Sequence, residues 1–133
     1  MKTLHTYVIP RPFNGYNIPI AIQSSYLKDY ANKNNLIFKL PITEITKSNS
    51  YAMLLRLLND KTINNIGFVS GFVLPIYQLK KLNKLLEKTN RNLKFHLALE
   101  NIVFDNKDLL NWAKNLNDIK IISSDYNKIL NED

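Results

Sequence analysis

The sequence predicts a three-layer α/β sandwich, in which helices cover both faces of a mostly parallel sheet of four or five strands. Short apolar segments alternate four times with segments whose apolar residues recur at helical spacing. The connections are short, and right-handed crossovers between parallel strands place helices on both faces of a sheet. We expect a single domain over residues 1–133, which is long enough to bury roughly two-thirds of its unfolded surface.

The first half of the chain is expected to supply two strands and two helices in alternation. They are predicted at residues 5–9 (strand), 19–33 (helix), 36–40 (strand) and from 51 onward (helix). Pro10 and Pro41 end the two strands, because proline cannot donate to a ladder hydrogen bond. Pro19 favours the first turn of a helix, and Ser50 is suited to be the N-cap of the second helix.

The second half is expected to repeat this alternation. The predicted elements are a buried central strand at 66–70, a helix that begins at Pro75, a strand at 93–99, a helix capped by Asp105 and a fifth strand at 119–122. Residues 124–133 are expected to fray. The preferred strand order is 2-1-3-4, as in flavodoxin-like proteins, which makes the loop 11–18 face the loop 70–74.

Most of the reactive side chains fall in loops that follow predicted strands. In an alternating α/β protein, ligands bind outside the carboxyl ends of the strands, where these loops meet. Arg11 suits bidentate recognition of a carboxylate or phosphate, although it could equally be a solvated charge or the partner of an acid. Asn14 and Tyr16 belong to a turn with amide donors. Gln23 could point into the crevice or lie on the surface.

Three titratable side chains are candidates for acid–base chemistry. Glu44 follows the second strand and Glu100 ends the fourth, so either could act as a general base or bind a sugar hydroxyl. The alternative for each is a salt bridge, for instance with Arg11. His96 shares a strand face with Glu100 but lies roughly 13 Å from it at 3.3 Å per residue. His96 could instead be a core histidine with satisfied hydrogen bonds.

The remaining candidates lie at helix starts and strand ends. Ser48 and Ser50 precede a helix, whose N-terminus offers free N–H donors to an anion. The complete set of predicted binding residues is Arg11, Phe13, Asn14, Tyr16, Gln23, Ser48, Ser50, Ser70, Phe72 and Asn101, with Glu44, Glu100 and His96 as the catalytic candidates. Arg11, Glu44 and Glu100 are expected to converge on one pocket.

Several classes of function are excluded by what the sequence lacks. Without cysteine there is no disulfide framework, thiol chemistry or thiolate metal site. The three glycines form neither a dinucleotide-binding nor a P-loop pattern, and there is no G-x-S-x-G elbow. The two histidines have no second candidate ligand nearby in sequence, so we expect no metal and no cofactor. No segment reaches the length of a membrane span and no signal peptide is visible, so we expect a cytoplasmic protein without membrane contact.

The net charge of +7 does not by itself predict nucleic-acid binding. Lysine outnumbers arginine 15 to 3, and asparagine and isoleucine are abundant at 19 and 15 residues, as AT-rich coding produces whatever the function. Much of the charge lies on the polar positions of one predicted helix, at Lys80, Lys81, Lys84 and Lys88. Such runs are usually solvated faces, so nucleic acid is not the expected partner.

A series of short motifs carries a resemblance over about residues 5 to 104. They are Arg11-Pro12-Phe13-Asn14-Gly15, Pro19, Gln23, Tyr30, Thr43-Glu44, Ser50 with Met53-Leu54, Ser70-Gly71-Phe72-Val73-Leu74-Pro75, and His96 with Glu100. In this order they resemble the sporadic carbohydrate cluster proteins, a bacterial family encoded among genes for surface polysaccharide. One departure is Ala31, where that family has a cysteine. The family has no established activity, so the resemblance implies a pathway rather than a reaction.

A second resemblance rests on strand–helix order and on the Tyr-x-x-x-Arg start, here Tyr7 and Arg11. These features are similar to the catalytic domain of serine recombinases, and imply a resolvase-like fold. That family carries a serine two residues after the arginine, where this chain has Phe13. An arginine-rich turn after the third strand is replaced by residues 72–75. Recombinase chemistry would therefore lack its nucleophile.

Three functions remain open at this stage. The leading hypothesis is a protein of bacterial surface-carbohydrate (lipopolysaccharide or exopolysaccharide) biosynthesis. It would bind an anionic sugar or sugar-derived acid, with cofactor-independent isomerase, epimerase or lyase chemistry as one possibility. The second is a non-catalytic scaffold for an enzyme of that pathway, and the third is a nucleic-acid-binding protein with a recombinase-like fold. Exposed sheet edges also favour a homodimer.

Overall fold

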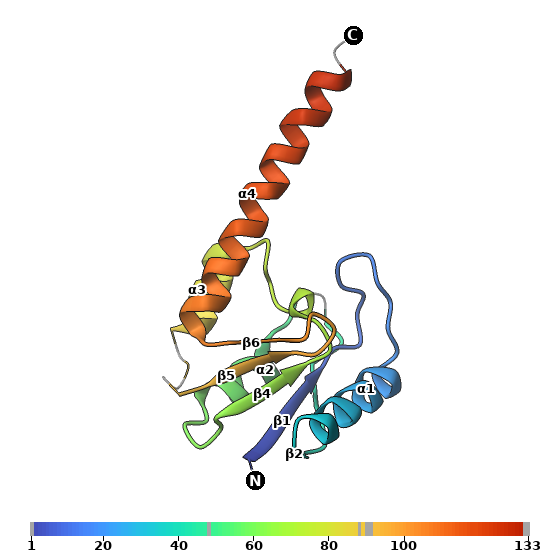
Figure 1. Cartoon of the computed structure of the whole chain (residues 1–133), viewed down its shortest axis with the longest axis vertical. Helices are drawn as coiled ribbons and strands as arrows, with labels where there is room; N and C mark the ends of the chain where they lie inside the picture. The colour runs from blue at the N-terminus through green and yellow to red at the C-terminus, as the bar shows by residue number, and fades with distance from the viewer. Residues whose placement is uncertain (1, 48, 88, 90–91, 132–133) are drawn as a thin grey trace.

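The structure is a computed structural model that describes residues 2–47, 49–87, 89 and 92–131. Its elements, in chain order, are β1 (Lys2–Val8), α1 (Ile20–Lys33), β2 (Leu36–Phe38), β3 (Ile42–Thr43), α2 (Ala52–Asn59), β4 (Asn65–Phe68), the 3-10 helix η1 (Gly71–Val73), α3 (Leu79–Leu86), β5 (Lys94–Leu97), β6 (Ile102–Phe104) and α4 (Asn106–Asn131). Figure 1 shows how these elements are arranged.

The sheet is mostly parallel, and its order confirms the predicted 2-1-3-4 arrangement. The strands run β2-β1-β4-β5-β6, and β3 also pairs with β1. All pairs are parallel except β5 with β6, which is antiparallel. The parallel strands therefore end at one edge of the sheet, and the loops that follow them share that edge.

Helices cover both faces of the sheet, so the predicted α/β class is confirmed. On one face, Leu4 and Val8 of β1 pack with Leu27 and Tyr30 of α1. The opposite face contributes the larger core, which joins β1, β4 and β5 to α2, α3 and the first turns of α4. Successive residues of β1 alternate between these two cores because side chains on a strand alternate between its faces. Figure 1 shows α1 on the far side of the sheet from α2 and α3.

The predicted fifth strand at 119–122 is wrong, because these residues continue α4 to Asn131. The edge beside β5 is occupied instead by β6, which the sequence analysis missed. Asp105 starts α4 as predicted, with its Oδ1 accepting from the N–H of Asp108 at 2.8 Å. No glycine or proline follows to end the helix. The second half of α4 extends beyond the rest of the domain (Figure 1), and no described helix is long and apolar enough to cross a membrane.

The helix predicted to begin at Pro75 starts four residues later, at Leu79. Leu74 is extended, with φ −80° and ψ 159°, and its side chain and that of Ile76 enter the core. Burial of these apolar side chains therefore outweighs the preference of proline for a first helical turn. The short helix η1 precedes this segment, and Ser70 caps it by accepting from the N–H of Phe72 at 3.2 Å.

The packing of α4 against η1 leaves no room for a side chain at Gly71. A Cβ there would lie 2.6 Å from the ring of Trp112 and 2.8 Å from Leu97. Gly71→Ala should lower the free energy of unfolding by about 2 kcal/mol, because overpacking displaces a large ring. Gly67→Ala is the control, since its Cβ would meet only the end of the Leu4 side chain at 3.0 Å. Equal losses for the two variants in urea unfolding would contradict this packing.

Candidate functional site

A cavity of about 390 Å³ lies where the loops after β1 and β4 meet the segment before α2. Its lining includes Arg11, Phe13, Tyr51, Phe72 and Tyr77. The residues described around the cavity include no acidic side chain. The cavity is at the carboxyl edge of the parallel strands, which is where α/β proteins bind ligands.

Arg11 brings hydrogen-bond donors without acceptors to this cavity. Both terminal nitrogens, Nη1 and Nη2, are buried, and neither has a hydrogen-bond partner among the described residues. The guanidinium carbon lies 4.7 Å from the centroid of the Tyr51 ring. A cation–π contact of this kind uses the face of the guanidinium and leaves its in-plane N–H donors unused. Buried donors without acceptors cost free energy, so an acceptor supplied by a ligand would be bound favourably.

Lys81 of α3 adds a second positive charge beside the same ring. Its Nζ lies 4.8 Å from the Tyr51 centroid and donates to the backbone oxygen of Asn49 at 3.0 Å. An ammonium group has three donors, so this bond leaves two available. Sequence reasoning missed both Tyr51 and Lys81, because it assigned Tyr51 to the helix core and Lys81 to a solvated face.

Gln23 fixes the loop that carries Arg11. Its carboxamide accepts from the N–H of Ile9 at 3.2 Å and donates to the oxygens of Ile9 and Ile18, both at 2.8 Å. The side chain is fully buried. Gln23 therefore holds the end of β1 against α1 and does not face the cavity. The sequence did contain a signal for this burial, because Gln23, Leu27 and Tyr30 are spaced so that they share one helical face.

The turn that follows Arg11 is tight. Phe13 and Tyr16 exchange backbone hydrogen bonds at 2.9 and 2.8 Å, and Asn14 and Gly15 between them have φ of 47° and 78°. Positive φ at both central positions is the pattern of a type I′ turn. Phe13 is buried in the main core and lines the cavity, whereas Asn14 and Tyr16 are exposed at the tip of the turn.

Glu44 is buried and binds the start of α2. Its carboxylate accepts from the hydroxyl of Tyr7 at 2.7 Å and from the N–H groups of Ile45, Met53 and Leu54 at 2.9, 3.1 and 3.2 Å. Ser50 donates a longer bond of 3.3 Å. The residue before α2 is Tyr51 and not the predicted Ser50. Ser50 Oγ still accepts from the N–H of Ala52 at 3.4 Å, while the Glu44 carboxylate satisfies the next two N–H groups, of Met53 and Leu54.

These contacts set the protonation of Glu44 and Tyr7. Burial alone would raise the pKa of Glu44, but the hydrogen bonds from Tyr7 and the three backbone N–H groups outweigh it, so the pKa is lowered. Burial, followed by the bond to the Glu44 carboxylate, raises the pKa of Tyr7. Glu44 is thus an anion whose two oxygens already accept hydrogen bonds from the protein. This arrangement suits a residue that positions the start of α2 better than one that transfers protons.

Glu100 joins the end of β5 to the end of β4. Its Oε1 accepts from the Ser70 hydroxyl at 3.1 Å and from the N–H of Gly71. Arg11, Glu44 and Glu100 thus follow strands that end at the same edge of the sheet. Of the three, only Arg11 lines the cavity within the described part of the chain. Ser70 is buried, and its hydroxyl donates to Glu100 and accepts from the N–H of Phe72.

His96 is part of a buried network on the α1 side of the sheet. Its Nε2–H donates to the side-chain oxygen of Asn65 at 2.8 Å, which leaves Nδ1 to accept from the Tyr30 hydroxyl at 2.8 Å. Burial, with a smaller contribution from the charge of Lys2, lowers the pKa of His96 to about 4. Both ring nitrogens are occupied, as in the core-histidine alternative, and His96 does not line the cavity that holds Arg11.

The other predicted residues lie in separate places. Phe72 lines the Arg11 cavity, with its ring centroid 6.3 Å from that of Tyr77. Asn101 lines a different cavity of about 430 Å³ between α1 and the end of β5. Ser48 lies outside the described residues. Over the part of the chain that the structure describes, no three metal-binding side chains form a cluster.

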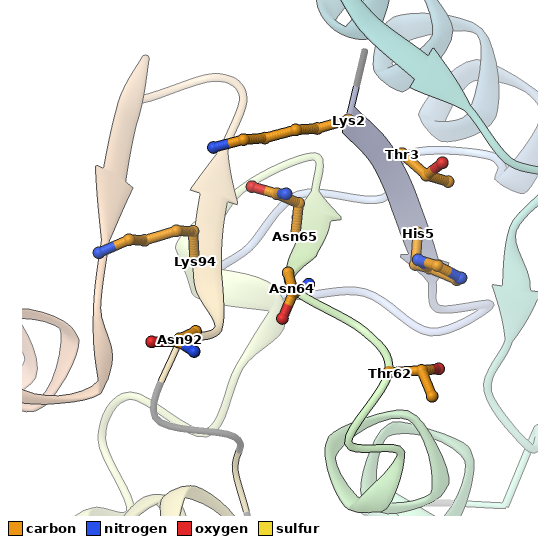
Figure 2. Close-up of a pocket in the computed structure, with 8 residues that line it drawn as sticks. All are labelled: Lys2, Thr3, His5, Thr62, Asn64, Asn65, Asn92 and Lys94. Atoms are coloured by element: carbon orange, nitrogen blue, oxygen red, sulfur yellow. The ribbon is translucent and has the colours of Figure 1, made fainter.

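A further cavity of about 590 Å³ lies at the opposite, amino edge of the sheet. Lys2, Lys94 and His5 are among its lining residues, and Figure 2 shows the two lysines extended to one side and His5 on the other. Burial, and then the charge of Lys39, lowers the pKa of His5. These side chains do not converge on one point, so Arg11 defines the better candidate site.

Comparison with known proteins supports the fold only. No family model matches the sequence, and neither does any curated protein. A solved structure with a similar fold is the N-terminal catalytic domain of TP901-1 integrase, with a TM-score of 0.60 and 16% sequence identity. The match covers 90% of this chain and 96% of that chain. The recombinase-like architecture suggested by the sequence is therefore present.

Proposed function

We propose that this protein binds a small anionic ligand at Arg11. The observation that carries the proposal is the buried guanidinium, whose two terminal nitrogens have no acceptor among the described residues. Arg11 would bind the carboxylate or phosphate, and Gln23 and Glu44 would position the loop and the helix that surround it. A planar guanidinium gives bidentate recognition that a lysine cannot reproduce.

The pathway we propose is bacterial surface-carbohydrate biosynthesis, with an anionic sugar or sugar-derived acid as the ligand. This part rests on the motifs that resemble the sporadic carbohydrate cluster proteins. We assign no acid–base step to the three candidates. Hydrogen bonds already occupy both oxygens of Glu44 and both ring nitrogens of His96, and Glu100 does not line the Arg11 cavity within the described residues.

Ligand-induced thermal stabilisation tests this proposal. A panel of sugar phosphates, nucleotide sugars and keto-acid sugars should contain ligands that raise Tm by about 10 °C at a hundred times Kd, since binding stabilises by about 2.7 kcal/mol there. Arg11→Lys should remove most of the shift, whereas Arg56→Lys, a change on α2, should keep it. Absence of any shift, or one that Arg11→Lys leaves intact, would refute an anion site at Arg11.

Nucleic-acid binding is the second candidate, and one observation favours it beyond the fold. Lys81, which contacts Tyr51 and Asn49 of the cavity lining, is on the same helix as Lys80 and Lys84, so basic side chains adjoin the site. Phe13 stands where a recombinase has its serine, so binding would occur without that strand-cleavage chemistry. An affinity for DNA or RNA that falls steeply with salt would support this alternative, and no mobility shift at low salt would remove it.

A further inference from the structure

The charges around the Arg11 cavity point to a ligand with more than one negative charge. Arg11 and Lys81 lie 4.7 and 4.8 Å from the centroid of the same Tyr51 ring. No acid lines the cavity in the described part of the chain. A carboxylate would neutralise only one of the two cations, whereas a phosphomonoester carries about −1.5 to −2 charges at neutral pH and three acceptor oxygens. The charge of a phosphate therefore suits the two cations better than that of a carboxylate does.

Part of the cavity wall is aromatic. Phe72 lies between Tyr77 and Trp112, with ring centroids 6.3 and 5.6 Å away. Two side chains from the middle of α4 contact this part of the wall: Lys120 Nζ lies 4.3 Å from the ring centroid of Tyr77, and Asn117 donates to the backbone oxygen of Ile76 at 2.9 Å. Tyr77 nevertheless remains 41% exposed. It therefore offers a preorganised surface on which a ring can stack.

We propose that the ligand of this site is a phosphomonoester attached to a ring, a chemistry shared by sugar phosphates and mononucleotides. The phosphate binds Arg11 and is attracted by the charge of Lys81 on the same Tyr51 ring, and the ring of the ligand packs on Phe72 and Tyr77. A cavity of about 390 Å³ suits one such unit, since small-molecule sites span roughly 300–1,000 Å³. This inference rests on the proposed anion site and narrows it from any anion to one class.

Calorimetric titration with matched probes tests the class of ligand. The probes are glucose 6-phosphate, adenosine monophosphate, inorganic phosphate and glucuronate, which pairs a sugar ring with a carboxylate. We expect the better of the two ring phosphates to bind about tenfold more tightly than glucuronate, because a second charge-assisted contact forms. The ring phosphate that binds more tightly identifies the source as a sugar or a nucleotide.

Variants measure separately how much Lys81 and the aromatic surface at Tyr77 contribute to the binding of ring phosphates. Lys81→Gln should weaken ring-phosphate binding about tenfold, whereas the control Lys80→Gln, an exposed neighbour on α3, should change it by less than about twofold. Tyr77→Ala should weaken ring phosphates about fivefold and leave inorganic phosphate unchanged, and Tyr77→Phe should restore the binding. Circular dichroism confirms that each variant is folded.

The possible failures are distinguishable. If glucuronate binds as tightly as the ring phosphates, or if Lys81→Gln acts no differently from Lys80→Gln, the phosphomonoester inference is overturned. The anion site survives in that case, provided that Arg11→Lys still abolishes binding. If no probe binds in a manner that depends on Arg11, the anion site and the inference fall together.

Discussion

Replacement of Glu44 by alanine is expected to lower the free energy of unfolding by about 4 kcal/mol. The carboxylate accepts hydrogen bonds from the Tyr7 hydroxyl and from the N–H groups of Ile45, Met53 and Leu54, and the side chain is only 2% exposed. Removal of the acceptor leaves several buried donors unsatisfied at once, and each costs about 1–3 kcal/mol before the structure relaxes. Urea unfolding at neutral pH measures the change.

Two control variants show whether this loss comes from the carboxylate. Glu44→Gln keeps the size of the side chain and one acceptor oxygen, so it should cost about half as much. Glu87→Ala removes an exposed glutamate after α3 and should leave the unfolding midpoint unchanged within error. A loss for Glu44→Ala as small as that for Glu87→Ala would show that the carboxylate does not hold the start of α2.

Stability is expected to fall by about 3 kcal/mol between pH 6.5 and pH 4 because of His96. Burial lowers its pKa to about 4 from the ordinary 6.5, so over this range the unfolded chain binds a proton that the folded protein does not. The contribution of His96 is complete above pH 6.5 and is lost as the pH falls. His5, whose pKa is also lowered, acts with the same sign.

His96→Gln isolates the part that belongs to His96. Its amide can accept from the Tyr30 hydroxyl and donate to Asn65, as the neutral ring does, but it does not titrate. Chemical denaturation at several pH values should give a clearly shallower pH dependence for this variant than for the parent protein. An unchanged slope would show that His96 is not the buried neutral ring described here.

The strand order could be predicted from the sequence, whereas strand β6 and the continuation of α4 through residues 119–122 could not. Regular alternation of apolar segments with helical patterns specifies a parallel sheet through the right-handed crossover. The apolar residues 119–122 fit a strand as well as they fit a helix. They are helical in the structure, where β6 and not this segment pairs with the edge of β5. Which strand reaches an edge is decided by tertiary pairing and not by local pattern.

For the site, the position of a residue relative to the predicted strands was informative, but the residues that it contacts could not be predicted from the sequence. Arg11 follows a strand between two prolines, which is visible in the sequence, and its place at the carboxyl edge follows from the fold. The role of Glu44 depends on the start of α2, which is eight residues later in the chain but beside Glu44 in space. Tyr51 precedes α2 and Lys81 belongs to α3, and only folding brings Arg11 and Lys81 to the same Tyr51 ring.

The most direct test of the site is the NMR spectrum of the arginine side chains during titration with phosphate. The chain has only three arginines, Arg11, Arg56 and Arg91, and the Nε–H signal of Arg11 is assigned by its absence in Arg11→Lys. Because the buried guanidinium has unused donors, its signal should shift saturably with phosphate while the other two scarcely move. An Arg11 signal that moves no more than those of Arg56 and Arg91 up to the highest phosphate concentration would contradict an anion site at Arg11.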